Sequence, residues 1–235
     1  MSFRSLDTLN QAIVTCRRCP RLVAWREQVA REKRAAFREE EYWGRPVPSF
    51  GDPEARVLVC GLAPAAHGGN RTGRVFTGDR SGDWLFAALF RAGFANQPES
   101  RHREDGLRLQ GCYITACVHC APPGNRPNTE ERDVCLAYLE QELPLLESLR
   151  VIVCLGAFAW EGALRTLRVL GHALNRKPRF GHGAEASVGP YVLIGCYHPS
   201  QQNTFTGRLT EAMLDAVLER ARRLALTGAE PKAPG

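Results

Sequence analysis

The chain has 235 residues, 44% of them hydrophobic and 24% charged, a balance typical of one globular domain with a sizeable core. Its 31 Lys and Arg against 25 Asp and Glu give a net charge of +6, which suits a polyanionic partner without establishing one. The N-terminal stretch lacks the apolar core of a signal peptide, and the longest apolar run, 151–160, is too short to span a membrane. We therefore expect a cytoplasmic protein with no membrane partner.

Helices and strands are expected to alternate along the chain. Ser5 or Asp7 can cap a short first helix, and residues 21–42 form a charge-rich helical stretch. Apolar runs predict four buried strands, at 57–60, 112–117, 151–156 and 191–196. Helices are expected from a Ser81 cap to Gly93, after a capping box of Asn128 and Glu131 up to Pro144, over 157–170, and over 207–226.

This alternation predicts an α/β fold with a parallel sheet and helices on both faces. Three strands are followed by loops rich in Gly, Pro, His and Asn: GLAPAAHGG, VHCAPPGNRP and YHPSQQNT. In such folds the ligand lies at the carboxyl ends of the strands. We therefore expect these loops to assemble the active site.

The first loop matches neither common phosphate-binding motif. Ala66 stands where a Walker A loop needs its second Gly, and no Lys follows. Ala63 stands at the second Gly of the dinucleotide fingerprint. Small residues with Pro64 still let the backbone approach a ligand closely, although a plain strand-to-helix connection explains the loop equally well.

The cysteines include two pairs at metal-ligand spacing. Cys16 and Cys19 allow one loop to present two thiolates, and Cys117 with Cys120 repeats the spacing. Alternatively, Cys120 and Cys135 complete the set, and four thiolates suit an iron–sulfur cluster as well as zinc. The total of nine cysteines excludes complete disulfide pairing, so we expect the others to be buried free thiols.

His198 directly follows the last apolar strand and precedes Pro199. Its ring is therefore expected at the carboxyl edge of the sheet, where it can donate a hydrogen bond to an oxygen that gains negative charge. The alternative is a structural histidine.

The segments GLAPAAHGGNRTGRVFTGDRSGDWL, TACVHCAPPGNRPN and HPSQQNTFTGRLT, with the early CxxC, resemble the uracil-DNA glycosylase superfamily, most closely its iron–sulfur branch, family 5. The resemblance implies an α/β/α sandwich around a short, mainly parallel four-stranded sheet. It implies one domain over 1–226, including an N-terminal cluster-binding segment, and a flexible tail at 227–235. It also implies hydrolytic removal of uracil and other deaminated or damaged bases (hypoxanthine, etheno-adducts) from DNA, which leaves an abasic site.

The resemblance assigns residues to each part of that function. It implies a [4Fe–4S] cluster on Cys16, Cys19, Cys120 and Cys135, with Cys117 left aside. The flipped base is expected to stack on an aromatic ring, against loop backbone and a small side chain, in a pocket of Gly61, Leu62, Ala63, Pro64, Ala65, Phe76 and Ala116. Phe76 is alternatively an ordinary core residue.

The catalytic pair implied by the resemblance is His198 and Asp79. His198 would stabilise the departing base. Asp79 is the candidate for orienting the water, because the first motif lacks a polar side chain; it is equally a candidate cap residue. Ala116 replaces an Asn of related families, which widens the range of bases. Ser200, Asn203 and Arg208 are expected to contact DNA, or else to cap and solvate the last helix.

The expected partner is damaged DNA, double- or single-stranded, and recruitment by a sliding clamp stays open. A monomer would suffice for base flipping. No Lys lies in the proposed pocket motifs, so Schiff-base lyase chemistry is not expected. The rivals are a zinc-stabilised nucleic-acid-binding module without catalysis and a small-molecule nucleoside or nucleotide hydrolase.

Overall fold

Six strands form one mixed sheet in the order β1-β3-β2-β4-β6-β5. The strands are β1 Phe50–Gly51, β2 Val57–Gly61, β3 Cys112–Ala116, β4 Val151–Leu155, β5 Glu185–Val188 and β6 Tyr191–Cys196. The central four, β3, β2, β4 and β6, run parallel and are the four that the sequence predicts. The expected strand count was wrong because a short antiparallel strand flanks each side: β1 beside β3 and β5 beside β6.

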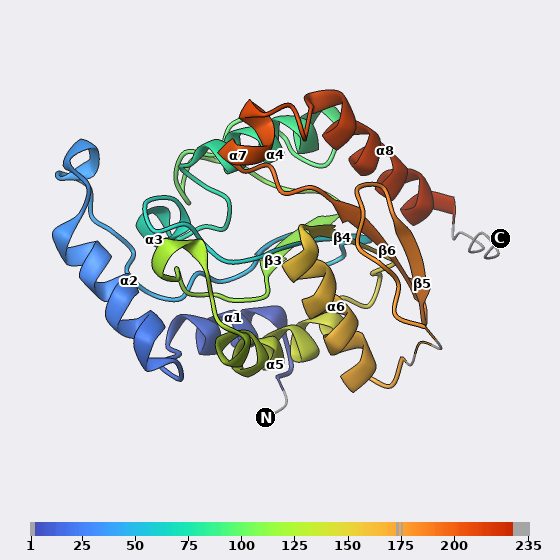
Figure 1. The fold of residues 1–235 in the computed structure, drawn as a ribbon, viewed down its shortest axis with the longest axis horizontal. Coiled ribbons are helices and arrows are strands. Elements are labelled where there is room, and N and C mark those ends of the chain that lie inside the picture. The colour runs from blue at the N-terminus through green and yellow to red at the C-terminus, as the bar shows by residue number, and fades with distance from the viewer. Residues whose placement is uncertain (1–2, 173, 175, 228–235) are drawn as a thin grey trace.

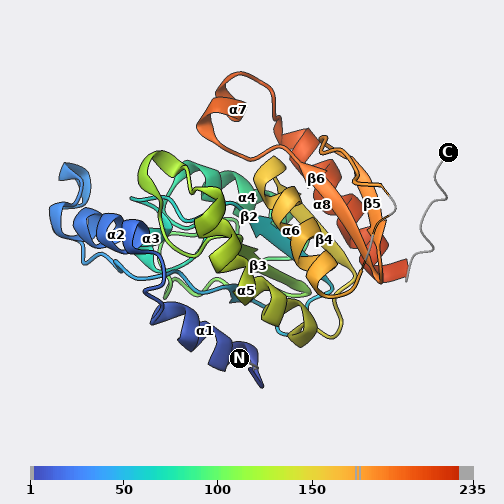
Figure 2. The ribbon, with the colours of Figure 1, turned by 60° about the horizontal axis from the view of Figure 1, so that its bottom comes forward.

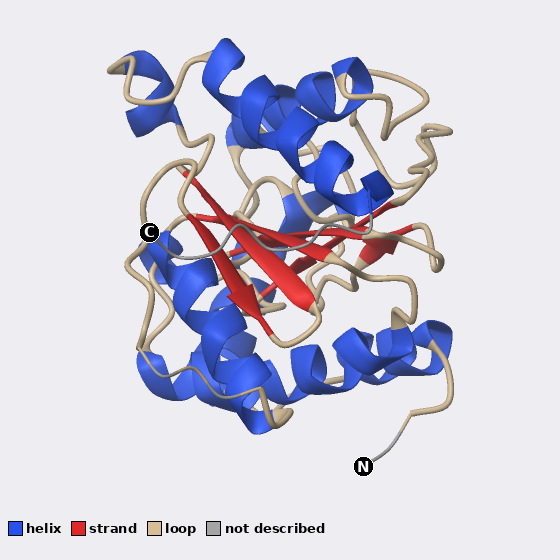
Figure 3. Ribbon diagram, turned by 90° about the vertical axis from the view of Figure 1, so that its right-hand side faces the viewer, coloured by secondary structure: helices blue, strands red, loops and turns tan. Residues whose placement is uncertain are grey.

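Helices cover both faces of this sheet and make three layers (Figures 1 and 3). They are α1 Leu6–Val14, α2 Pro20–Glu32, α3 Gly69–Thr72, α4 Arg80–Arg91, α5 Thr129–Leu145, α6 Ala157–Val169, α7 Gln201–Phe205 and α8 Glu211–Thr227, with short 3-10 turns at Ala35–Phe37 and Pro123–Asn125. Helices α4 and α8 lie on one face, and α1, α5 and α6 on the other. The α/β/α sandwich implied by the resemblance is confirmed.

Strand side chains alternate between two apolar cores, which explains the continuous apolar runs. Val57 and Val59 of β2 pack in the core that contains the buried leucines of α4 and α8. Leu58 and Cys60 of the same strand point the other way, into the core beneath α5 and α6. A strand buried on both faces needs apolar residues at every position.

Several helix boundaries differ from the expectation. The helix expected over 21–42 ends at Glu32, and the last helix begins at Glu211 rather than 207, with α7 a separate element. Asp79, not Ser81, caps α4: its side chain accepts from the Gly82 amide. The capping boxes of Ser5 with Thr8 and of Asn128 with Glu131 are both present. Pro144 lies within the final turn of α5 and the helix ends one residue later.

The computed structural model describes residues 3–172, 174 and 176–227. Of the tail expected at 227–235, residue 227 closes α8 and the rest lies outside the described residues. Within the described part of the chain, no helix combines the length and the apolar character needed to cross a membrane.

The strand order reverses at β2. After β2 the chain pairs β3 on one side, then crosses to place β4 on the other side. Ligands of open α/β sheets bind outside the carboxyl ends of the strands at such a switch point. The loop that begins at Gly61 leaves β2 at this position.

Candidate active site

The loop after β2 is bound to the segment after β3. Gly61 pairs with Ala116 in the sheet, and the amides of Cys117 and Val118 donate to the carbonyls of Gly61 and Leu62, each at 3.0 Å. Ala116 is buried, and it contributes only a methyl group at this edge. The two loops therefore form one continuous wall, with Ala63 and Pro64 next along it.

Phe76 lies against this wall in a strained backbone conformation. Its φ is +51°, a region that bulky residues rarely adopt. A Cβ on Gly61 would lie 2.7 Å from the Phe76 ring, so only glycine at the strand end admits the ring there. The Phe76 and His198 rings lie 5.8 Å apart between centroids and 33° from parallel. Backbone strain of this kind clusters at functional sites.

The turn that holds Phe76 fits closely against α4. A Cβ on Gly82, in the first turn of α4, would lie 1.8 Å from the Phe76 carbonyl oxygen. The hydroxyl of Thr77 accepts from Arg74 Nε at 3.0 Å, and the carbonyl of Gly78 accepts from Arg71 Nη2 at 2.9 Å. Two arginines therefore fix the turn between Phe76 and Asp79.

Arg74 is itself fixed by a buried ion pair. Its guanidinium binds Asp105 through two hydrogen bonds, of 2.9 and 2.6 Å, and also donates to Ser100. Both partners are nearly inaccessible, with side chains 3% and 8% exposed. Arg74, together with the amides of Arg101 and Leu107, lowers the pKa of Asp105 despite its burial. The segment around residue 105 thereby supports the pocket turn.

Asp79 uses its two carboxylate oxygens differently. Oδ1 accepts from the Gly82 amide at 3.0 Å and caps α4. Oδ2 faces Gly68 of the first loop, where an added Cβ would lie 2.1 Å away. Burial raises the pKa of this carboxyl, partly offset by the backbone hydrogen bonds. The cap interpretation is correct, and the same geometry leaves one oxygen directed at the first loop.

His198 lies at the carboxyl edge of β6, as predicted. Burial lowers the pKa of its imidazole to about 4, so the ring is neutral at physiological pH. Gly156, which follows β4 with a φ of +94°, would place a Cβ 3.7 Å from the His198 Cβ. The Asn203 side chain donates to the His198 carbonyl at 2.9 Å. Asn203 therefore positions the backbone of His198.

The segment around α7 projects from the edge of the sheet (Figure 2). Ser200 precedes α7 at its N-cap position, and Arg208, exposed, stacks over the Tyr197 ring at 4.6 Å. Phe205 is 66% exposed, and the Arg80 guanidinium lies 4.4 Å from its ring centroid. An exposed aromatic ring with a cation beside it lies next to the His198 loop.

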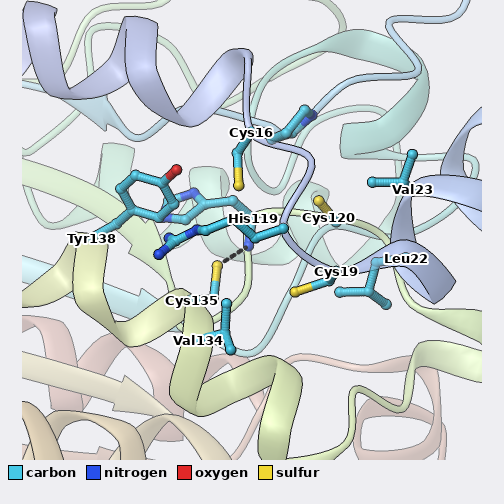
Figure 4. A pocket seen from close by; sticks show the side chains of 11 residues that line it. Cys16, Cys19, Leu22, Val23, His119, Cys120, Val134, Cys135 and Tyr138 are labelled. Atoms are coloured by element: carbon cyan, nitrogen blue, oxygen red, sulfur yellow. Dashed lines mark hydrogen bonds between the residues drawn. The ribbon is translucent and has the colours of Figure 1, made fainter.

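Four cysteines surround a separate hollow beside α2. The hollow is lined by Cys16, Cys19, Cys120 and Cys135 together with Leu22, Val23, Pro46, His119, Val134, Tyr138 and Arg18. Figure 4 shows the four sulfur atoms around it. The His119 amide donates to the Cys135 sulfur at 3.4 Å.

The alternative ligand Cys117 points elsewhere. Its sulfur lies 3.7 Å from that of Cys60 in the core beneath α6, where a Cβ on Gly162 would come within 2.4 Å of it. Of the two ligand sets left open by spacing, only the one with Cys135 shares a hollow with Cys16 and Cys19. All nine cysteines are free thiols.

The protonation of these thiols depends on their surroundings. Burial raises the pKa of Cys120 to about 11 and raises those of Cys19 and Cys135. The pKa of Cys16 is lowered, because hydrogen bonds from Tyr138 and Arg18 outweigh burial. Among the described residues, no group of three or more His, Cys, Asp or Glu stands at the spacing of a single-ion site.

Several site residues carried no recognisable signal in the sequence. Gly68, Gly82 and Gly156 act through close contacts with Asp79, Phe76 and His198, which depend on how the chain folds. Arg71 and Arg74 lie within the motif RTGRVFTGD, yet their targets are backbone or hydroxyl groups of the same turn. Phe205 is part of HPSQQNTF, and its exposure distinguishes it from a core residue.

Comparison with known proteins agrees with this geometry. The model of the Uracil DNA glycosylase superfamily matches residues 48–222. A type-5 uracil-DNA glycosylase of Mycobacterium bovis is 56% identical over 94% of this chain and 82% of its own length. Proteins of the same name from Mycobacterium leprae and Thermus thermophilus are 56% and 53% identical, over 94% and 92% of this chain and 96% of their own lengths. Because the family model spans most of the chain and every loop of the pocket, the chain belongs to the uracil-DNA glycosylase superfamily.

Proposed function

We propose that this chain is a monofunctional uracil-DNA glycosylase, which flips uracil out of DNA and hydrolyses its N-glycosidic bond to leave an abasic site. The observation that carries the proposal is that Phe76 and Asp79 both lie against the loop after β2, with His198 beside the Phe76 ring. The names of the relatives and the family of the chain support the same reaction.

The pocket suits a planar base. A base inside a duplex is inaccessible to an enzyme, so it must rotate out of the stack, at a cost of a few kcal/mol. Phe76 offers a ring on which the base can stack, and its strained backbone is held by Arg71 and Arg74. Gly61 borders the ring, and backbone groups of the loop that follows it are proposed to meet the base edge.

His198 stabilises the leaving base as a neutral donor. As the C1′–N bond breaks, negative charge develops on the oxygens of the base while the sugar becomes oxocarbenium-like. A neutral imidazole donates one hydrogen bond to such an oxygen. The low pKa of His198 makes proton donation by an imidazolium ineffective at neutral pH, so the base departs as an anion and takes its proton from solvent.

Asp79 is the residue proposed to orient the water. With Oδ1 fixed by the Gly82 amide, Oδ2 is the oxygen free to accept a hydrogen from a water molecule near the sugar. The water oxygen bonds to C1′, and its proton passes to the carboxylate and then to solvent. The negative charge also stabilises the cationic sugar.

The small side chain of Ala116 supports a broader range of bases. It is buried at the pocket wall and has no hydrogen-bonding group with which to select uracil. We therefore extend the proposal to hypoxanthine and etheno-adducts.

Phe205 and its neighbours are proposed to contact the DNA around the flipped base. Apolar side chains inserted between base steps fill the space that a flipped base leaves. Phe205 is exposed beside the His198 loop with Arg80 next to it, and Arg208 lies over the Tyr197 ring of the same segment; both cations are proposed to contact phosphates. Every group of this site comes from one chain, so a monomer suffices. A cytoplasmic location is part of the proposal, because reduced cysteines are typical of that compartment.

We propose a [4Fe–4S] cluster on Cys16, Cys19, Cys120 and Cys135. The donor set fits: four sulfurs line one hollow, and a backbone amide donates to one of them, as thiolate ligands require. When bound, the cluster cross-links the segment before α2 to the segment after β3 and to α5. No step of the reaction passes through it.

The test is abasic-site formation on duplex DNA with one uracil, comparing wild type with His198→Ala and Asp79→Ala. We expect cleavage by wild type and a loss of roughly 10²-fold or more in each variant. Absence of abasic sites with both uracil- and hypoxanthine-containing DNA would reject the enzyme and favour a binding module. Hypoxanthine and etheno-adenine duplexes, tested in parallel, decide the wider substrate range.

Metal analysis separates the cluster from zinc. Protein purified without oxygen should be brown and contain iron and sulfide in near-equal amounts. Cys135→Ala should lose the iron, whereas Cys117→Ala, its matched control, should keep it. Colourless protein with zinc would support the rival module.

A further inference from the structure

Arg26 is a buried cation at the cysteine hollow. Its side chain, on α2, is 2% exposed and is among the largest that are fully buried. Its Nη1 donates to the Cys120 sulfur at 2.9 Å, and its Nη2 donates to the Cys16 carbonyl at 3.2 Å. The guanidinium therefore contacts both the segment that carries Cys16 and the segment that carries Cys120.

This charge lacks an adequate carboxylate partner. Glu27 Oε1 lies 3.8 Å from Arg26 Nη2, but Glu27 is partly exposed and already pairs with Arg17. The Arg26 Nε has no hydrogen-bond acceptor. A buried guanidinium is costly unless a nearby negative charge compensates it. The nearest group able to supply that charge is the Cys120 sulfur.

We propose that Arg26 compensates the negative charge of the thiolate-bound group on Cys16, Cys19, Cys120 and Cys135, and thereby helps to retain it. The inference rests on the cofactor proposed above. Four thiolates bring more negative charge than the metal they bind neutralises, so the bound site is anionic, and a cation with a hydrogen bond to one sulfur stabilises it. Arg26 is a positioning and charge-compensating residue, not a ligand.

Arg26 also connects the hollow to the pocket. Its carbonyl accepts from the side chain of Asn70 at 3.2 Å. Asn70 is fully buried in α3, two residues after Gly68, which contacts Asp79. The residue that compensates the cysteine site thus holds the loop that borders the catalytic carboxylate.

The proposal predicts that the effect of Arg26→Met on the Tm depends on whether the cysteine site is loaded, which a double-mutant cycle measures. In the loaded protein, Arg26→Met should lower the Tm, because the anionic site loses its counter-charge. In a Cys120→Ala background, which removes the acceptor sulfur and the loaded site, Arg26→Met should raise the Tm or leave it unchanged, because an unpaired buried charge is removed. An Arg26 that merely packs would lower the Tm equally in both backgrounds, and that result would overturn the proposal.

Iron release gives a second readout that does not require the Cys120→Ala protein. Iron release to a ferrous chelator, monitored as the loss of visible absorbance, should be about 10–100-fold faster in Arg26→Met than in wild type. Arg26→Lys, which keeps the charge and loses the fork, should fall between them. Arg31→Met, an exposed residue of the same helix, is the matched control and should equal wild type.

Unchanged release in Arg26→Met would overturn the proposal. Wild-type metal content is measured first: protein without iron, sulfide or zinc would refute the cofactor and this role with it. The abasic-site assay does not depend on these measurements, so a failure of the proposed glycosylase activity is recognised separately from a failure of the Arg26 proposal.

Discussion

Gly68 and Asp79 lie so close together that no side chain fits between them. A Cβ at residue 68 would lie 2.1 Å from Asp79 Oδ2 and 2.9 Å from its Cγ. Since Oδ1 is held by the Gly82 amide, the carboxylate cannot rotate away without giving up the cap of α4. If Asp79 orients the water as proposed, the first loop assists by leaving room for its carboxylate at Gly68.

Gly68→Ala should reduce kcat by roughly 10²-fold with little change in KM, because displacement of a catalytic group by about 1 Å has that effect. The clash of an added Cβ with the Asp79 carboxylate is the effect that this substitution tests. Single-turnover cleavage of uracil-containing duplex measures it. Gly181→Ala, where the added Cβ would make an ordinary 3.5 Å contact, is the control. Equal activity of the two variants would show that Asp79 does not need its present position.

Arg74→Met should lower both stability and kcat. The buried Asp105 carboxylate loses its partner, which costs about 3–5 kcal/mol of unfolding free energy. Thr77 loses its hydrogen bond from Arg74, so the Phe76 turn loosens and kcat falls more than KM rises. Arg74→Lys should recover stability in part. Arg91→Met, the control, breaks an exposed ion pair with Asp215 and should lower the free energy of unfolding by less than about 1 kcal/mol. Urea unfolding measures both variants.

The sequence was sufficient to predict the parallel centre of the sheet and insufficient at its edges. β2, β3 and β4 are buried at every position and β6 over its last four residues, and all four strands are mostly apolar. By contrast, β1 has only two residues, and most of β5 is exposed or half-buried, so neither gives an apolar run. Gly207, with a φ of +68°, separates α7 from α8, whereas the sequence predicted a helix that begins at 207 and no helix at α7.

The candidate site divides in a similar way. The place of His198 at the carboxyl edge of the sheet was predictable, because it directly follows an apolar strand, whereas the roles of Phe76, Asp79 and His198 stay predictions. The choice between Cys117 and Cys135 was not: it depends on which side of the sheet the chain faces after β3. The contact of Arg26 with Cys120 joins segments far apart in the chain, and that of Gly68 with Asp79 depends on how the loop between them folds, so spacing carries no signal for either.

The pH profile should report a neutral His198. Its imidazole gains a proton only as the pH falls through about 4. Burial raises the pKa of Asp79, so on acidification this carboxylate is neutralised at a higher pH than an exposed aspartate would be. kcat/KM should therefore be flat around neutrality and fall on the acid side as Asp79 and His198 gain protons. In Asp79→Asn the remaining activity should fall only near pH 4. Half-loss near pH 6.5, abolished by His198→Ala, would contradict the neutral imidazole.

Phe205→Ala should impair cleavage of duplex DNA more than cleavage of single strands. A flipped base leaves a gap only in a stacked duplex, so a side chain that fills it matters there. The exposed ring contributes little to folding, and the Tm should not change. The ratio of kcat/KM on duplex to single-stranded uracil DNA measures the effect. Val169→Ala, similarly exposed on α6, should leave this ratio unchanged, and an unchanged ratio in Phe205→Ala would place the ring outside the DNA contact.

Glu142→Gln should stabilise the protein at alkaline pH. Glu142 is 1% exposed in α5, and neither carboxylate oxygen has a well-formed hydrogen bond, although the Ser49 and Thr115 hydroxyls are near enough to lower its pKa. Burial dominates and raises the pKa from 4.5 to about 7. The protonated folded form is favoured, so its contribution to stability is complete below about pH 4.5 and is lost as pH rises through 7.

The loss amounts to about 3 kcal/mol, at 1.36 kcal/mol per pKa unit. Glu142→Gln carries no charge and should keep its stability across this range, so its Tm should exceed that of wild type at pH 8.5 and equal it near pH 5. Thermal unfolding at the two pH values measures the difference. Glu147→Gln, exposed just beyond the same helix, should follow wild type at both. A Glu142→Gln protein that is less stable than wild type at pH 8.5 would mean that the ionised carboxylate has a stabilising partner.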